Sequence, residues 1–284
     1  MTPSSGSNVF QNESKNAKQT RVTASLSEQP VHAPSNVMSV AFQNLSVHAF
    51  RRQTDYQRTV SNFFNAWLTI CVNWVMRKPK LRVDILHDFD SLIASGEMLL
   101  VLGNPGSGCT TLLKSLAGQT HDLCVNPQSI LNYQGLSSKQ MFAEFRDKKT
   151  YQAEFDIHFP TLTMRETLEF ASKARKLPHD WDGCHTAVET VARTLGLTKA
   201  LDVKMGNALV PGVSGGERKR TSIAEILLGD SVFQCWDNST RGLDSVNALD
   251  FIKTLRGRTS ESGSIAIVTL YQAGEDRYLR RPRS

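Results

Sequence analysis

The chain has 284 residues, enough for one large domain or two small ones, and its 40% apolar and 21% charged residues are ordinary for a globular protein. The net charge of +6 comes from scattered basic residues, with the densest cluster at residues 277–283, so we expect no nucleic-acid partner. Five cysteines without a CxxC pair argue against a disulfide framework and a zinc site, and they favour a reducing compartment.

Residues 1–36 are rich in Ser, Asn, Gln and Thr and poor in large apolar side chains, so we predict a disordered tail. The alternation in residues 39–47 predicts a half-buried strand. The apolar run at residues 63–76 is shorter than the ~20 residues that span a bilayer. We expect a helix there that lies against the domain or the bilayer interface. We also expect no signal peptide and no transmembrane segment in this chain.

From residue 98 onward, short apolar runs alternate with helical segments. The predicted strands are 98–102, 150–153, 232–236 and 265–270, and the predicted helices are 110–117, one that starts at the capping box of residues 163–166, and 245–255. This alternation predicts an α/β fold with a mainly parallel sheet covered on both faces. Residues 163–205 have helical patterns and little strand signal, which indicates an inserted helical subdomain.

A glycine-rich segment connects the strand at 98–102 to the helix at 110–117. It follows the phosphate-loop pattern GxxxxGK[ST] in the strand-to-helix setting that this motif requires. Main-chain N–H groups of residues 106–110 and the positive end of the helix favour phosphate, and the Thr110 hydroxyl is placed to bind Mg²⁺. The candidate nucleotide-binding residues are Gly103, Asn104, Pro105, Gly106, Ser107, Gly108, Cys109, Thr110 and Thr111.

Cys109 stands where the phosphate-loop pattern has lysine. Its thiol cannot supply the ammonium that reaches the β- and γ-phosphates, a charge-assisted contact of about 1.5–3 kcal/mol. On this segment alone, a glycine-rich turn that binds nothing is the alternative. We predict that ATP binding survives the substitution and that hydrolysis at this site is weakened.

Two further motifs follow the phosphate loop. Val213-Ser-Gly-Gly-Glu-Arg-Lys-Arg220 precedes a predicted helix, and its combination with the loop excludes small-molecule kinases and GTPases. Asp237 ends the strand at 232–236 and is the candidate carboxylate for Mg²⁺. The next residue is Asn238, whose amide cannot take a proton, so general-base help is lost there.

Together with the stretch at residues 153–163 and the Tyr271-Gln272 pair, these motifs resemble the first nucleotide-binding domain of fungal pleiotropic-drug-resistance ABC transporters. The similarity covers about residues 39–272. It implies a P-loop NTPase (RecA-like) fold with ATP and Mg²⁺ as cofactors. Spacing to the Phe-Pro and Leu-Thr pairs that follow favours Glu154 over Gln152 as the Q-loop residue. Tyr271 occupies the position of the switch histidine.

The resemblance also implies how the chain works within a transporter. Two such domains form a head-to-tail dimer with two composite ATP sites. The degenerate site here would bind ATP and hydrolyse it poorly, with Asn238, Tyr271 and Glu154 at altered catalytic positions. The signature motif would complete the competent site of the second nucleotide-binding domain in trans; its residues are Ser214, Gly215, Gly216 and Glu217. The other implied partners are the transmembrane domains and hydrophobic drug-like compounds exported across the plasma membrane, with this domain on the cytoplasmic face.

We predict a nucleotide-binding domain over residues 37–284, with its core at about 81–160 and 209–284 and the helical subdomain at about 161–208. The sequence leaves the family pattern soon after Gln272 and stops before the closing elements of the domain. We therefore expect a truncated domain with uncovered apolar sheet surface and marginal stability in isolation.

Two alternatives to the transporter interpretation remain. One is a soluble ABC-type regulator, although such proteins usually keep the lysine and glutamate that Cys109 and Asn238 replace. The other is a non-functional gene fragment, which an ATP-binding titration would distinguish.

Overall fold

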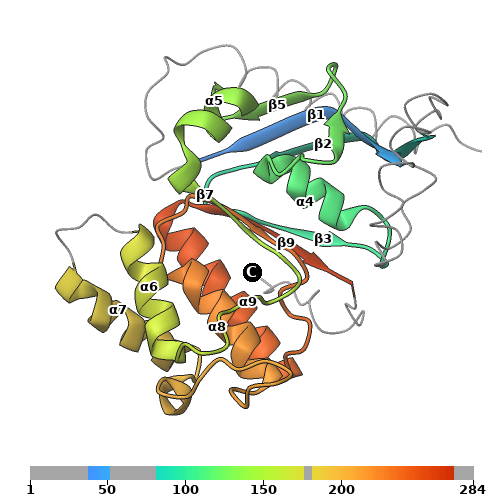
Figure 1. Ribbon diagram of the computed structural model, residues 1–284. Coiled ribbons are helices and arrows are strands. Elements are labelled where there is room, and N and C mark those ends of the chain that lie inside the picture. The colour runs from blue at the N-terminus through green and yellow to red at the C-terminus, as the bar shows by residue number, and fades with distance from the viewer. Residues whose placement is uncertain (1–37, 52–80, 176–180, 272–284) are drawn as a thin grey trace, which may run out of the picture.

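The computed structural model describes residues 38–51, 81–175 and 181–271. The predicted tail at 1–36 and the predicted helix at 63–76 lie outside these residues. The described chain contains one antiparallel and one parallel sheet, with helices packed between and beneath them (Figure 1).

The antiparallel sheet has the strand order β2-β1-β5-β6, and β4 also pairs with β1. Its strands are β1 (Val40–Arg51), β2 (Leu81–Ile93), β4 (Leu123–Val125), β5 (Ile130–Tyr133) and β6 (Leu136–Ser137). A short helix, α5 (Ser138–Glu144), follows β6. The alternation at 39–47 correctly predicts part of β1, but the sequence patterns did not reveal the rest of this sheet.

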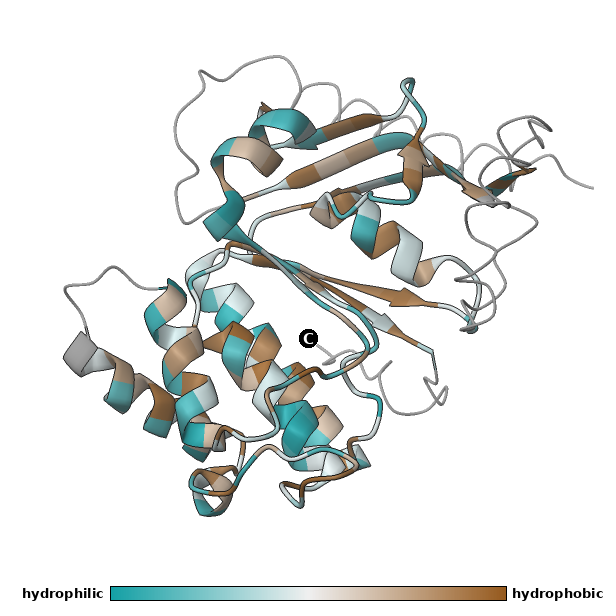
Figure 2. Ribbon diagram, viewed as in Figure 1, coloured by the Kyte–Doolittle hydropathy of each residue, from teal (hydrophilic) through white to brown (hydrophobic). Residues whose placement is uncertain are grey.

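The parallel sheet has the order β3-β9-β8-β7 and corresponds closely to the predicted strands. Its strands are β3 (Met98–Leu102), β7 (Lys149–Gln152), β8 (Phe233–Trp236) and β9 (Ile265–Leu270). Every residue of β8 and β9 is buried, which explains their mainly apolar sequence, in which Gln234 and Thr269 are the polar residues. Strands β3 and β9 of this sheet are among the most apolar parts of the molecule (Figure 2).

Helix α4 (Cys109–Ala117) lies between the two sheets (Figure 1). Its leucines pack with Phe42 and Leu45 of β1 and with Phe233 and Ile267 on one face of the parallel sheet. This packing fixes the phosphate loop, which leads directly into α4.

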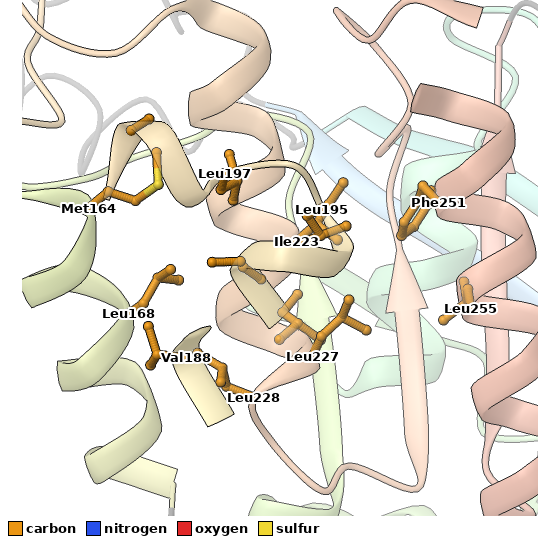
Figure 3. Packing of buried hydrophobic residues seen from close by; sticks show 14 of the residues in the cluster. Met164, Leu168, Val188, Leu195, Leu197, Ile223, Leu227, Leu228, Phe251 and Leu255 are labelled. Atoms are coloured by element: carbon orange, nitrogen blue, oxygen red, sulfur yellow. The ribbon is translucent and has the colours of Figure 1, made fainter. Parts of the chain in front are cut away.

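The opposite face of the parallel sheet packs against a second core formed mainly by helices. These are α6 (Met164–Arg175), α7 (Trp181–Thr194), α8 (Gly215–Leu227) and α9 (Ser245–Ser262). Side chains such as Leu168, Ile223, Leu227 and Phe251 meet in this core (Figure 3). Helix α9 continues past residue 255, where the prediction ended it, and stops at a left-handed Gly263 with φ 71°.

The prediction that a helix begins at Thr163 is confirmed. Glu166 accepts hydrogen bonds from the N–H and hydroxyl of Thr163, and the Thr163 hydroxyl accepts one from the Glu166 N–H.

Candidate nucleotide-binding site

The predicted site residues gather where the four parallel strands end. β3 leads into the phosphate loop, β8 into Asp237 and Asn238, β9 into Tyr271, and β7 toward Glu154. The ends of parallel strands share one edge of the sheet, where ligands of open α/β folds bind. The loop joins this edge directly, because the Gly103 N–H donates to the carbonyl of Leu270 at 3.4 Å.

The phosphate loop presents its main chain to open space. Gly106 and Gly108 have φ values of 86° and 92°, which favour glycine, and a Cβ at Gly106 would meet no atom within 4 Å. Gly108 is the N-cap of α4 and has no side chain to satisfy the first helical N–H groups. These N–H groups and the positive helix end therefore suit an anion. The Cys109 side chain is buried, with its Sγ 3.3 Å from the Ser107 Oγ.

Asp237 lies at the centre of a hydroxyl network next to the loop. This buried carboxylate accepts hydrogen bonds from Thr110 at 3.2 Å, Tyr151 at 2.9 Å and Thr269 at 3.0 Å. The Thr110 hydroxyl is also 2.7 Å from the Tyr271 hydroxyl. The two candidate Mg²⁺ ligands, Thr110 and Asp237, are thus held together by direct contact.

Both tyrosines of this network are held in the neutral form. Burial, with a further contribution from the Asp237 carboxylate, raises the pKa of Tyr151 and of Tyr271. Each hydroxyl therefore keeps its proton near neutral pH and remains a hydrogen-bond donor.

Glu154 and Asn238 contact each other at the same edge. The Asn238 side-chain amide donates to the Glu154 carboxylate at 3.0 Å, and the Arg241 guanidinium donates to the same oxygen. Burial by itself would raise the pKa of Glu154, but the hydrogen bonds from Arg241 and Asn238 lower it. Asn238 has φ 46°, a left-handed conformation that asparagine tolerates better than most residues. Gln152, the alternative Q-loop residue, is buried and accepts a hydrogen bond from Ser239 instead.

The signature motif forms the start of α8. The Ser214 hydroxyl accepts a hydrogen bond from the Glu217 N–H at 3.3 Å, and the Glu217 carboxylate accepts from the Ser214 N–H and hydroxyl at 2.8 Å. Gly215 is exposed, and a Cβ there would meet nothing within 4 Å. Helix α8 packs on the opposite face of the parallel sheet from α4. The N-termini of α4 and α8 therefore do not form one phosphate-binding site.

Sequence reasoning missed four residues of this region: Tyr151, Thr269, Arg241 and Lys219. Tyr151 and Thr269 each lie near the end of a predicted strand, so the alternation of side chains along the strand could have predicted that they point toward Asp237. Nothing in the local sequence indicates that Arg241 contacts Glu154, which is 87 residues away.

The family model for the ABC transporter matches residues 86–241, more than half of the chain and all of the motifs described above up to Arg241. The chain belongs to the ABC transporter family. A second model, the ABC-transporter N-terminal region, matches residues 9–63. The N-terminal model is followed along the chain by the ABC transporter model, which confirms the resemblance to the first nucleotide-binding domain of the fungal transporters. Membership of the ABC ATPase family implies ATP as the ligand.

Curated relatives of the chain are fungal ABC proteins. It is 48% identical over 261 residues to the ABC multidrug transporter C of Aspergillus fumigatus, an alignment that covers 89% of this chain and 17% of that protein. It is 46% identical to the ABC-type transporter eriD of Hericium erinaceus, covering 89% and 18%. It is 47% identical to the ABC multidrug transporter MDR3 of Trichophyton rubrum, covering 89% and 17%. The chain thus spans under one fifth of the length of these relatives. Among the residues described here, no helix is long and apolar enough to cross a bilayer.

Proposed function

We propose that this ABC domain binds Mg-ATP at its own phosphate loop and hydrolyses it slowly or not at all. The main support for this proposal is the hydrogen bond between Thr110 and Asp237 beside the loop. In addition, Cys109 and Asn238 occupy the two positions whose side chains normally promote hydrolysis. The framework for binding is therefore retained where the groups for hydrolysis are replaced.

The residues present fit a metal-bound triphosphate. The exposed main chain at Gly106 and the first N–H groups of α4 suit the phosphates, and the Thr110 hydroxyl and Asp237 carboxylate are oxygen ligands of the kind that Mg²⁺ prefers. Bound Mg²⁺ would neutralise phosphate charge and orient the β- and γ-phosphates. Tyr271, which touches Thr110, would hold that hydroxyl in place.

Slow turnover follows from the side chains of Asn238 and Cys109. The Asn238 amide cannot accept a proton from water, and in the absence of nucleotide it donates to Glu154. Cys109 provides no cation for charge that develops on the γ-phosphate.

We further propose that the chain acts within a drug-efflux transporter, where its signature motif serves a second nucleotide-binding domain. The multidrug transporters named among its relatives, and the exposed Ser214 and Gly215, support this role. Exposed apolar side chains at Phe155, Ile157 and Phe159 suit contact with the membrane domains, and export of hydrophobic compounds across the plasma membrane would follow.

The test is isothermal titration of the purified chain with Mg-ATP. We expect saturable binding without appreciable phosphate release, and about 10–100-fold weaker binding for Asp237→Ala, since one charge-assisted contact is lost. Asp237→Asn keeps the side-chain shape and should also bind weakly. Asp250→Ala, a surface aspartate of α9, is the matched control.

Two results would contradict the proposal. Absence of binding by the folded wild-type chain would favour a non-functional fragment. Rapid hydrolysis that persists in Asp237→Ala would show that the catalytic site lies elsewhere.

A further inference from the structure

In the segment that follows β7, the apolar side chains are exposed and the polar side chains are buried. From Phe155 to Phe159 the exposure alternates, and Phe155, Ile157 and Phe159 are 71%, 90% and 71% exposed. The side chains between them, Asp156 and His158, are only 18% and 3% exposed. An extended segment normally turns its apolar side inward. Here the polar side faces the protein and the apolar side faces outward.

The inward side of this segment contacts one helix, α8. The ammonium of Lys219, whose side chain is 3% exposed, donates to the Glu154 carbonyl at 2.9 Å and lies 3.3 Å from the Asp156 carboxylate. An ammonium this deeply buried requires such partners, because an unpaired buried charge is costly. Lys219 therefore fixes both the main chain and a side chain of the segment.

His158 provides a second attachment to the same helix. Its Nε2 is 2.9 Å from the Ser222 hydroxyl and its Nδ1 is 3.3 Å from the Glu225 carboxylate. Lys219, Ser222 and Glu225 are spaced three residues apart, so they lie on one side of α8. Nearly two turns of the helix are thus joined to this short segment.

Helix α8 begins with the signature motif, and Lys219 is five residues from Ser214, about 7–8 Å along the helix. We propose that Lys219 and His158 are positioning residues that join residues 154–159 to the signature turn of α8, so that the two move together as one rigid unit. Movement of the apolar surface would then move Ser214 directly, through a buried polar connection within one chain. The use of this unit rests on the transporter role proposed above, but its existence does not.

The test compares local loosening at the two ends of the unit in the purified 284-residue chain, without nucleotide. Chymotrypsin can cleave after the exposed Phe155, whereas Pro160 protects the bond after Phe159, so the rate of cleavage after Phe155 reports loosening of the segment. Hydrogen exchange of the Glu217 and Arg218 amides, which are bonded to Ser214, reports loosening of the signature turn. Exchange in β9 serves as the reference for global stability.

We expect Lys219→Met, which keeps the side-chain length and removes the donors, to raise both rates about tenfold while β9 stays unchanged. The decisive variant changes only the segment, Asp156→Asn with His158→Gln, and it applies if Lys219→Met does not fold. Neither residue touches Glu217 or Arg218 in the hydrogen bonds described, yet exchange at that turn should still rise severalfold. Lys253→Met, an exposed lysine of α9, is the matched control and should change neither rate.

Faster cleavage with unchanged exchange at the signature turn would overturn the proposal, as would no change at either end. An equal rise in all segments including β9 would also overturn it, because that pattern reports general destabilisation. Since no nucleotide is present, these outcomes do not depend on whether the chain binds Mg-ATP.

Discussion

The phosphate-loop edge of the parallel sheet and the signature turn of α8 differ in what each retains. At the edge, the glycine loop, the start of α4 and the Thr110–Asp237 contact are in place, but Cys109 and Asn238 replace the lysine and glutamate. At the signature turn, Ser214 and Glu217 form a complete capping box. The phosphate-loop edge keeps its main-chain framework but has lost two reactive side chains, whereas the signature turn keeps its framework and its side chains.

The difference separates binding from chemistry in physical terms. Features made by the main chain, such as a left-handed glycine or a helix N-terminus, attract phosphate whatever the neighbouring side chains are. Proton transfer and charge stabilisation instead depend on particular side chains. With the role proposed above, a domain that holds ATP and serves a partner's site can lose the second set and keep the first.

The largest predicted effect concerns the contact of Glu154 with Asn238. The family pattern would have an amide and a carboxylate at these two positions in the reverse order. Asn238→Glu alone would place two carboxylates in contact and impose φ 46° on glutamate. We expect the free energy of unfolding in urea to fall by about 2–3 kcal/mol.

Adding Glu154→Gln to Asn238→Glu should recover the part of that loss that comes from the two carboxylates, because one donor and one carboxylate are restored. The strain of φ 46° on glutamate at position 238 remains. Glu154→Gln alone is the control that completes the double-mutant cycle. Strictly additive free energies would show that the two side chains do not interact.

The second prediction returns the missing cation to the phosphate loop. Cys109→Lys should tighten Mg-ATP binding by about 10–100-fold in isothermal titration, the value of one charge-assisted contact. Cys109→Met has a similar length without charge and should bind like the wild type. Hydrolysis should stay slow while Asn238 is present. An equal gain for both variants would mean that side-chain length, and not charge, limits binding.

The third prediction tests whether the two regions are independent. Ser214→Ala removes the N-cap of α8 and should lower the free energy of unfolding by about 1 kcal/mol. Mg-ATP affinity of the chain's own loop should stay unchanged, since α8 lies on the other face of the sheet. Ser214→Thr keeps the hydroxyl and is the control. A loss of affinity in Ser214→Ala would place the signature at the chain's own site.

The parallel sheet was predictable from sequence because both faces are covered, which gives mainly apolar runs such as Ile265–Leu270, where Thr269 is the one polar residue. Apart from the first part of β1, the antiparallel sheet was not. In β2, only Leu86 and Ile93 are buried, and register shifts in its pairing with β1 interrupt the alternation on which a strand prediction depends.

The site was predictable to the extent that its residues lie in contiguous motifs. Thr110, Asp237 and Tyr271 each follow a recognisable strand, and their shared edge follows from parallel pairing. The contacts of Arg241 with Glu154 and of Lys219 with Asp156 join segments far apart in the chain. They depend on the three-dimensional packing of α8 and of the turn that contains Arg241 against the segment after β7, which no local pattern encodes.

The smallest predicted effect is the pH dependence of the signature turn. The N–H and hydroxyl of Ser214 lower the pKa of Glu217, so its carboxylate is favoured in the folded state. A group with a lowered folded pKa contributes stability fully above its unfolded value, about 4.3, and this contribution is lost as pH falls through the folded pKa.

Glu217→Gln keeps the capping box and removes the titration. From about pH 5 to pH 3, the wild type should therefore lose stability more steeply than Glu217→Gln in urea unfolding. The difference should be below the effect of Ser214→Ala, because the turn is partly exposed and solvent screens the charge. Glu144→Gln, an exposed glutamate of α5, is the matched control and should follow the wild type. If Glu217→Gln instead follows the wild-type slope, the charge of the carboxylate adds nothing, and the signature turn is maintained by the capping hydrogen bonds that glutamine also makes.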